Sequence, residues 1–431
     1  MTNVVLITVD CLRADHLGCM GYHRDTSPFL DNLSHKSMFF SHAFANGPNT
    51  RHSVPSFLSS TYPLLFLDEA KGGKFHHGRL SVAEVFKKNG FVTAGIHSNP
   101  YVSQFYGYDR GFDYFNDFLL GQVDRDVKRG SLSNKFYEGL KGVKALVFHQ
   151  LPHETGEEIN ESVFNWLDSV DSSFFLWVHY MDVHMPYVPP NDFLRKLDLR
   201  SYSYARKVWM GKKIDDLKMR ENIKDKEISD YVNLYDGTIR YTDQVIANLV
   251  KGIEHKFSDT VFVITADHGE EFREHGGLSH VEKLYDELLH VPLMMYGKDV
   301  ESKQVSDVVS LVDLAPMILD IAGVDIPQDF MGGVNFSGKD FIIGECFNDG
   351  LKTAYRDLEW KYISGSNDNK LFYIAEDELE TKDVSVEHKD LVNKFESVIQ
   401  SHKAGLLAER KKRLTRMQKE KVKNVIGKIK L

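Results

Sequence analysis

The sequence predicts an α/β protein in which a mixed, mostly parallel β-sheet is sandwiched by helices and followed by a small C-terminal antiparallel subdomain. Two observations lead to this prediction. Apolar runs of strand length alternate with segments of helical periodicity over most of the chain, and after about residue 340 the pattern changes to short strands. The chain has 431 residues, enough for one large domain and a smaller appendage.

The first predicted strand, over residues 4–9, is an apolar run that is followed by Asp10. Such a run is typical of a strand that is buried on both faces. A carboxylate at the carboxyl end of a buried strand lies where α/β sheets open their active-site crevice. The alternative is that Asp10 caps the turn or helix that follows.

The chain up to residue 100 alternates between predicted helices and strands. Ser81 and Glu84 have the spacing of a capping box at the start of a helix, and Gly90 is a suitable stop. The other elements expected here are helices that begin near Phe29 and near Pro55, and strands over 39–44 and 91–96.

Later apolar runs predict further elements of the main sheet and its helices. Residues 117–158 and 191–228 carry many charges and few apolar clusters, so we expect both to be peripheral insertions. The predicted strands cover 173–178, 260–265, 291–296, 341–344, 360–363 and 370–374, and the predicted helices cover 228–253 and 314–322. We therefore predict a large domain over 1–335, a small α+β subdomain over 336–400 and a basic helical tail over 401–431.

Composition indicates an ordered globular protein, because 42% of the residues are hydrophobic and 12% are aromatic. Three cysteines are too few for a disulfide framework and suit a reducing compartment. No early stretch has the pattern of a signal peptide, and no apolar run has the length of a membrane span. We therefore expect a cytoplasmic protein. No feature of the sequence predicts its oligomeric state.

Charge is distributed unevenly along the chain. From Lys403 to the end there are eleven basic residues and two acidic ones, a net charge of +9, so the net charge of −9 leaves −18 on the remainder. The acidic remainder argues against nucleic acid as a partner. The tail is interpreted either as an amphipathic helix that contacts an anionic membrane surface, or as a solvated helix or partner-docking arm.

Three predicted strands are followed by residues that ligate metals: Asp10, the pair Asp267 and His268, and a turn that contains His184. Carboxylates together with imidazoles suit Zn²⁺ or Mn²⁺, whereas sets of oxygen ligands suit Ca²⁺ or Mg²⁺. Ser53 lies in a segment of small residues, two positions before a proline. A metal beside a serine lowers the pKa of the hydroxyl and makes it a usable nucleophile.

Three further residues have two interpretations each. Thr50 is either a rival nucleophile or a hydroxyl in a turn or helix cap. Asp182 either ligates a second metal or orients His184. Cys11 is either a soft metal ligand or a small buried residue.

At these residues the sequence resembles the sulfatase family of the alkaline-phosphatase superfamily. The resemblance implies a mixed, mostly parallel sheet between helices, with a smaller C-terminal antiparallel sheet. The matching stretches are 5–22, 53–63, 177–190, 263–277, 283–293 and 310–323.

The resemblance also implies roles for individual residues. Asp10, Asp267 and His268 match metal ligands of the family, and Ser53 stands where the family has its nucleophile. His184 resembles the histidine that contacts the ester or protonates the leaving group. His280 and Lys283 lie where the family supplies a polar or cationic contact to the substrate anion.

The chain departs from the family pattern at several positions. Phe57 replaces the arginine that guides conversion of the nucleophile to formylglycine, so we expect an unmodified Ser53. Cys11 replaces a second aspartate, and His268 replaces an asparagine, which shifts the metal preference from Ca²⁺ toward Mn²⁺ or Zn²⁺. Residues 97–100 replace the usual Lys-x-His and make the anion site less cationic.

The sequence thus predicts a hydrolase that uses one divalent metal ion (Mn²⁺, Zn²⁺ or Ca²⁺) to cleave sulfate or phosphate esters. The expected substrate is an anionic ester of a small molecule or of a glycan or lipid. One alternative is a phospho-head-group transferase or phosphodiesterase of the same fold that acts at a membrane face. Another is a degenerate binding protein without catalytic activity.

Overall fold

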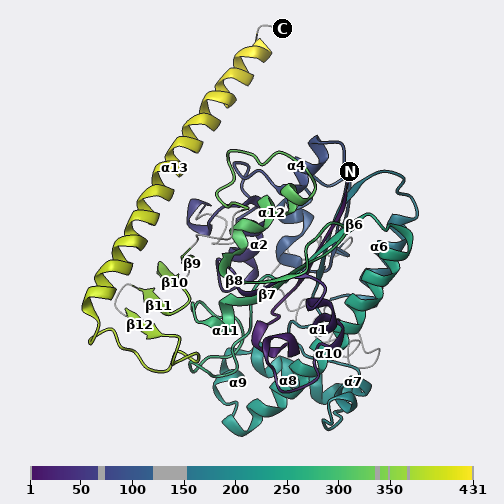
Figure 1. The fold of residues 1–431 in the computed structure, drawn as a ribbon, viewed down its shortest axis with the longest axis vertical. Coiled ribbons are helices and arrows are strands. Elements are labelled where there is room, and N and C mark those ends of the chain that lie inside the picture. Colours follow the sequence, from purple (N-terminus) through teal and green to yellow (C-terminus); the bar gives the residue numbers. More distant parts are fainter. Residues whose placement is uncertain are drawn as a thin grey trace, which may run out of the picture.

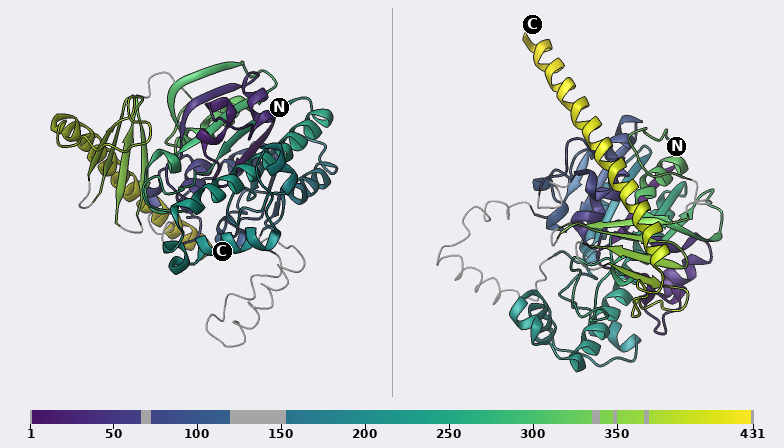
Figure 2. Two further views of the ribbon diagram at one scale, coloured as in Figure 1. Left: turned by 90° about the horizontal axis from the view of Figure 1, so that it is seen from below. Right: turned by 90° about the vertical axis from the view of Figure 1, so that its left-hand side faces the viewer.

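A computed structural model describes residues 2–66, 73–119, 153–334, 340–347, 350–365 and 369–429 of the chain. Most of the predicted insertion over 117–158 therefore lies outside the described residues. The rest forms a large α/β part and a smaller sheet with a long helix at its side (Figures 1 and 2).

The main sheet has eight strands, and its centre is parallel. The strands are β1 (Asn3–Val9), β2 (Met38–Phe44), β3 (Val92–His97), β4 (Tyr114–Asn116), β5 (Phe174–Tyr180), β6 (Thr260–Ala266), β7 (His290–Gly297) and β8 (Lys303–Ser310). Their order is β4-β3-β5-β1-β6-β7-β2-β8. The central strand β1 runs parallel to β5 and β6, whereas β7 runs antiparallel to β6 and β2. The predicted mixed, mostly parallel sheet is confirmed.

Helices cover both faces of this sheet, as Figure 1 shows. One face carries α1 (Pro28–Ser34), α6 (Gly156–Leu167) and α10 (Asp225–Lys256), and the other carries α2 (Thr50–Ser59), α4 (Val82–Lys88) and α12 (Leu314–Ile321). Because both faces are covered, every residue of β1, β5 and β6 is buried. The predicted capping box of α4 is present, with the Ser81 and Glu84 side chains each bonded to the other residue's backbone N–H.

The charged segment 191–228 folds into short helices before α10 begins. These are α7 (Asn191–Lys196), α8 (Tyr204–Asp215) and α9 (Leu217–Glu221), and α7 packs against α10. A further short helix, α11 (Asp286–Leu289), precedes β7. Within the described ranges, no helix is both long and apolar enough to cross a membrane.

The C-terminal part is an antiparallel sheet, as predicted, but it has four strands rather than the three expected from the sequence. It contains β9 (Ile342–Cys346), β10 (Lys352–Arg356), β11 (Trp360–Ser364) and β12 (Lys370–Tyr373), in the order β12-β11-β10-β9. The last helix, α13 (Lys389–Ile429), packs on β10 and β11 and then projects beyond the rest of the molecule (Figures 1 and 2). The predicted boundary at residue 401 falls inside this helix.

Two further differences from the prediction have clear physical reasons. Helix α2 begins at Thr50 rather than near Pro55, because the Asn49 side chain caps it by accepting the backbone N–H of His52. The edge strand β8 was not predicted, because its first residues are mostly exposed and polar, and its sequence lacks a long apolar run.

Candidate active site

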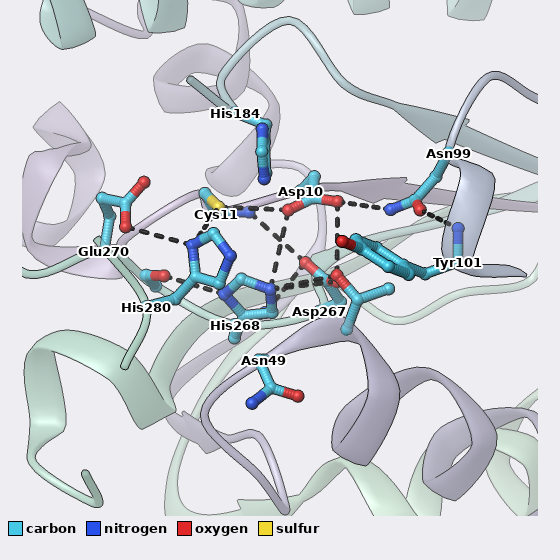
Figure 3. A network of polar contacts seen from close by, with 12 residues as sticks. Asp10, Cys11, Asn49, Asn99, Tyr101, His184, Asp267, His268, Glu270 and His280 are labelled. Atoms are coloured by element: carbon cyan, nitrogen blue, oxygen red, sulfur yellow. Dashed lines mark hydrogen bonds and ion pairs between the residues drawn. The ribbon is translucent and has the colours of Figure 1, made fainter. Parts of the chain in front are cut away.

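The carboxyl ends of the central parallel strands meet at one edge of the sheet and bring the predicted ligands together. Asp10 follows β1, and Asp267 and His268 follow the neighbouring strand β6. His184 lies in the turn after β5, on the other side of β1. Figure 3 shows these side chains facing one another. This is the edge at which α/β sheets place their active sites.

Asp10, Asp267 and His268 form a fully buried set of metal-type ligands. One donor atom from each lies within 4.8 Å of the other two, and all three residues are 0% exposed. The Nε2 atom of His268 lies 3.6 Å from Asp10 Oδ1 and 3.4 Å from Asp267 Oδ2. Its Nδ1 atom lies 2.9 Å from the Gly269 carbonyl oxygen, to which it donates, so Nε2 is the atom left to bind a metal.

The electrostatics of this set fit a divalent cation. Burial and the charge of Asp10 raise the pKa of Asp267, while burial lowers the pKa of His268 to about 3. Burial acts to raise the pKa of Asp10 as well, but His184 and other neighbouring histidines hold it well below its usual value. Asp267 Oδ2 is buried without a hydrogen-bond partner among the described residues. Two buried carboxylates and a neutral imidazole are a suitable ligand set for Zn²⁺ or Mn²⁺.

Two further residues hold Asp10 in place. Asn99 Nδ2 donates to Asp10 Oδ2 at 2.7 Å, and His179 Nε2 lies 3.3 Å from the same oxygen. The Nδ1 atom of His179 is 2.9 Å from the Thr8 hydroxyl. Asn99 follows β3 at the same edge of the sheet, and that position is the sequence signal that identifies it.

The structure places Thr50, rather than Ser53, beside the metal-type ligands. Thr50 Oγ1 lies 3.3 Å from His268 Nε2 and 3.5 Å from Asp10 Oδ2. Ser53 is fully buried, and its hydroxyl has no hydrogen-bond partner among the described residues. Because α2 begins at Thr50, Ser53 lies about 4.5 Å further along the helix axis.

His280 lies in the cluster, as predicted, but Lys283 is bound elsewhere. His280 Nδ1 is 3.2 Å from Glu270 Oε1, and its ring lies 4.7 Å from that of His268. Burial acts to lower the pKa of His280, but the Glu270 carboxylate raises it above its usual value. Lys283 Nζ instead donates to both carboxylate oxygens of Glu271, at 2.8 and 2.9 Å. This ion pair engages the ammonium group that the family resemblance assigns to the substrate anion.

Cys11 and His184 complete the surroundings of Asp10. The Cys11 thiol is buried and donates to Asp10 Oδ1 at 3.1 Å. His184 Nδ1 lies 2.7 Å from the carbonyl oxygen of Met185, to which it donates, so Nε2 remains for other contacts. The His184 ring lies 5.1 Å from the His280 ring. Asp182 accepts the Gly156 backbone N–H at the start of α6.

Comparison with known proteins identifies the family to which the chain is similar. The family model described as Sulfatase matches residues 2–324. Iduronate 2-sulfatase of Homo sapiens is 26% identical over 411 residues, which cover 75% of this chain and 70% of that protein. Arylsulfatase K of Mus musculus is 24% identical over an alignment of 460 residues, and the alignment covers 93% of this chain and 79% of that protein.

Solved structures share the fold at lower identity. One is a protein in complex with its substrate D-glucosamine-2-N,6-O-disulfate, with a TM-score of 0.72, 16% identity, and coverage of 94% of this chain and 98% of the other. Another is the phosphonate monoester hydrolase of Silicibacter pomeroyi, with a TM-score of 0.70, 17% identity, and coverage of 94% and 95%. The family match extends over most of the large α/β part, including Asp10, Thr50, Asp267 and His268. The chain therefore belongs to the sulfatase family of ester hydrolases.

Proposed function

We propose that this family member is a metal-dependent hydrolase of phosphate or phosphonate esters whose nucleophile is Thr50. The observation that carries the proposal is the position of Thr50 Oγ1, 3.3 Å from His268 Nε2, in a ligand set that suits Zn²⁺ or Mn²⁺. Formylglycine is made from cysteine or serine, and Phe57 stands in place of the guiding arginine, so an unmodified hydroxyl fits this site better.

A divalent cation held by Asp10, Asp267 and His268 would neutralise the ester oxygens and lower the pKa of the Thr50 hydroxyl. Thr50 Oγ1 loses its proton to solvent and attacks the phosphorus in line, and an O–P bond forms while the bond to the leaving oxygen breaks. His184 gives a proton to the leaving oxygen and then takes one from the attacking water, as the bond between phosphorus and Thr50 Oγ1 breaks. His280, charged beside Glu270, stabilises negative charge on the non-bridging oxygens.

The comparisons support both sulfate and phosphonate esters as substrates. Relatives are named for sulfate esters of sugars, and one structural neighbour is named for phosphonate monoesters. Sulfate, phosphate and phosphonate esters of a glycan or small molecule are therefore the candidate substrates. The threonine nucleophile favours the phosphoryl esters among them.

The test is a parallel assay of the purified protein with aryl phosphate, aryl phosphonate monoester and aryl sulfate, each with added Mn²⁺, Zn²⁺ or Ca²⁺. We expect the phosphoryl esters to turn over faster and chelation to abolish turnover. Thr50→Ala should lower kcat by at least about 10³-fold, the scale expected for loss of a nucleophile. Ser53→Ala should leave kcat unchanged. An active Thr50→Ala variant, or a Ser53→Ala variant without activity, would reject the assignment.

A second candidate is a transferase that moves a phospho-head-group to an acceptor at an anionic membrane face. The long helix α13, with its basic C-terminal half that extends beyond the rest of the molecule, favours it (Figure 2). Turnover that requires an added alcohol acceptor, rather than water, would identify this activity.

A further inference from the structure

Arg51 is the residue next to the proposed nucleophile. It occupies the second position of α2, directly after Thr50, and is half-buried. Its guanidinium group lies 4.4 Å from the centre of the Tyr101 ring. Among the described residues, no carboxylate forms an ion pair with it, whereas Arg13 pairs with Asp15 and Glu274.

Tyr101 connects this guanidinium group to the active site. Its backbone N–H donates to Asn99 Oδ1 at 2.9 Å, and Asn99 in turn donates to Asp10. The short turn that contains Tyr101 packs against α2. In Figure 3 the Tyr101 side chain extends from this turn toward the side of the cluster where Asp10 lies. Tyr101 is nevertheless 46% exposed, so the Arg51–Tyr101 pair reaches the protein surface beside the site.

A guanidinium group that no carboxylate pairs with, at the protein surface beside a site, recognises anions. Stacking on an aromatic ring holds the guanidinium plane and leaves its N–H groups free to form charge-assisted hydrogen bonds. Carboxylate, sulfate and phosphate groups accept two such bonds at once. The metal-type ligands follow β1 and β6, whereas Arg51 lies on α2 against Tyr101, so the transferred group and this guanidinium group have separate anchoring points.

We propose that Arg51 and Tyr101 form a subsite for a second anionic group on the substrate, carried by the portion of the ester that leaves. This inference rests on the proposed function of the site and narrows its substrate to esters with two negative groups. The second group is a carboxylate, sulfate or phosphate, and all three share the chemistry that Arg51 recognises.

Binding to the metal-loaded Thr50→Ala protein tests this subsite without turnover. The probes are phenylphosphonate and 4-carboxyphenylphosphonate, which differ only in the second anionic group. We expect the carboxylated probe to bind about 10-fold more tightly or better, the scale of one charge-assisted hydrogen-bond pair. Arg51→Gln should remove that advantage and leave the affinity for phenylphosphonate within about twofold.

Lys74→Gln is the matched control, because Lys74 also lies over an exposed ring, that of Phe105, but is distant in sequence from the nucleophile. The control variant should keep the preference for the carboxylated probe. Equal affinities of the two probes in the parent protein, or an equal loss for both probes in Arg51→Gln, would overturn the proposal. The Thr50→Ala protein could distinguish the two probes while the parent protein hydrolyses no ester. That result would reject the proposed function and retain the subsite.

Discussion

At the scale of single residues, the site depends on what orients each ligand. Asp10 is held by Asn99 through a bond of 2.7 Å, and His268 is held by the carbonyl of its neighbour Gly269. These contacts orient the ligand atoms before a metal arrives, which is how outer-shell groups raise metal affinity. Thr50 is placed in the same way, because the cap at Asn49 decides where α2 begins.

Asn99→Ala should therefore weaken metal binding by about 10-fold, at the lower end of what outer-shell substitutions cost. The variant loses the hydrogen bond that aims Asp10 Oδ2, while all proposed ligands remain. Titration of the metal-free protein with Mn²⁺ or Zn²⁺ measures the effect. Asn89→Ala, which removes an amide that bonds a carbonyl at the end of α4, is the control and should bind metal normally. Unchanged affinity in Asn99→Ala would show that Asp10 needs no such support.

Asp243 provides a prediction on pH that does not involve the active site. Its carboxylate is 2% exposed and accepts the backbone N–H groups of Phe29 and Leu30 at the start of α1. Burial raises the pKa of Asp243 to about 7. Between about pH 4 and pH 7 the folded state keeps a proton that the unfolded state has lost, so this residue lowers the free energy of unfolding as pH rises.

The Asp243→Asn variant lacks the ionisable carboxyl, so its free energy of unfolding should not show this decrease with rising pH. Its free energy of unfolding, relative to the parent protein, should rise between pH 5 and pH 7 by at most about 1.4 kcal/mol per pH unit. Urea unfolding of both proteins at several pH values measures the difference. A difference that is constant with pH would mean that the Asp243 carboxyl is ionised throughout.

At the scale of elements, the sequence predicts the strands that build the site better than the residues that surround it. Asp10 and Asp267 were found because each follows a long apolar run, which is a local signal. The sequence leaves Thr50 open between a nucleophile and a capping hydroxyl, because the start of α2 depends on the cap at Asn49 and the family spacing points to Ser53. The family resemblance assigns Lys283 to the anion site, and its pairing with Glu271 is a tertiary contact that no local pattern shows.

The contact between the two sheets rests on a buried charge network at the element scale. Lys361 of β11 is 0% exposed, and its Nζ atom lies 2.6 Å from Asp286 of α11 and 2.8 Å from Glu380. Lys361→Met would leave Glu380 buried without this cation and Asp286 with Arg356 as its remaining partner, and it should lower the free energy of unfolding by about 3–5 kcal/mol. Chemical denaturation measures this loss.

Lys298→Met is the matched control for this substitution. Lys298 pairs with Asp259 on the surface, where ion pairs contribute little, so its removal should not change the unfolding midpoint. Equal midpoints for Lys361→Met and Lys298→Met would show that the network between the sheets adds no stability.

At the scale of the whole molecule, charge is separated along the chain. The residues before Lys403 carry a net charge of −18, and the residues from Lys403 onward carry +9. The backbone of α13 continues away from the acidic part, as Figures 1 and 2 show. Near the main body it is anchored by Arg416, whose guanidinium group pairs with Asp329. The basic residues from Lys419 to Lys428 therefore lie on the part of α13 that extends beyond this anchor.

Deletion of residues 418–431 tests the predicted contact with an anionic membrane surface. The full chain should bind vesicles that contain phosphatidylserine, and high salt should weaken this binding, because each basic residue near the surface contributes about 1 kcal/mol. The deletion should lower vesicle binding and leave hydrolysis of a soluble aryl ester unchanged. Equal binding of both proteins would favour the interpretation of the tail as a solvated or partner-docking helix.

The central claim is that Thr50 attacks the ester from within the Asp10, Asp267 and His268 ligand set. The most direct measurement is to quench the metal-loaded enzyme during turnover of an aryl phosphate and to locate the covalent intermediate by peptide mass spectrometry. The account predicts a phosphoryl group on Thr50 and none on Ser53. A phosphoryl group on Ser53, or a formylglycine at that position, would contradict it.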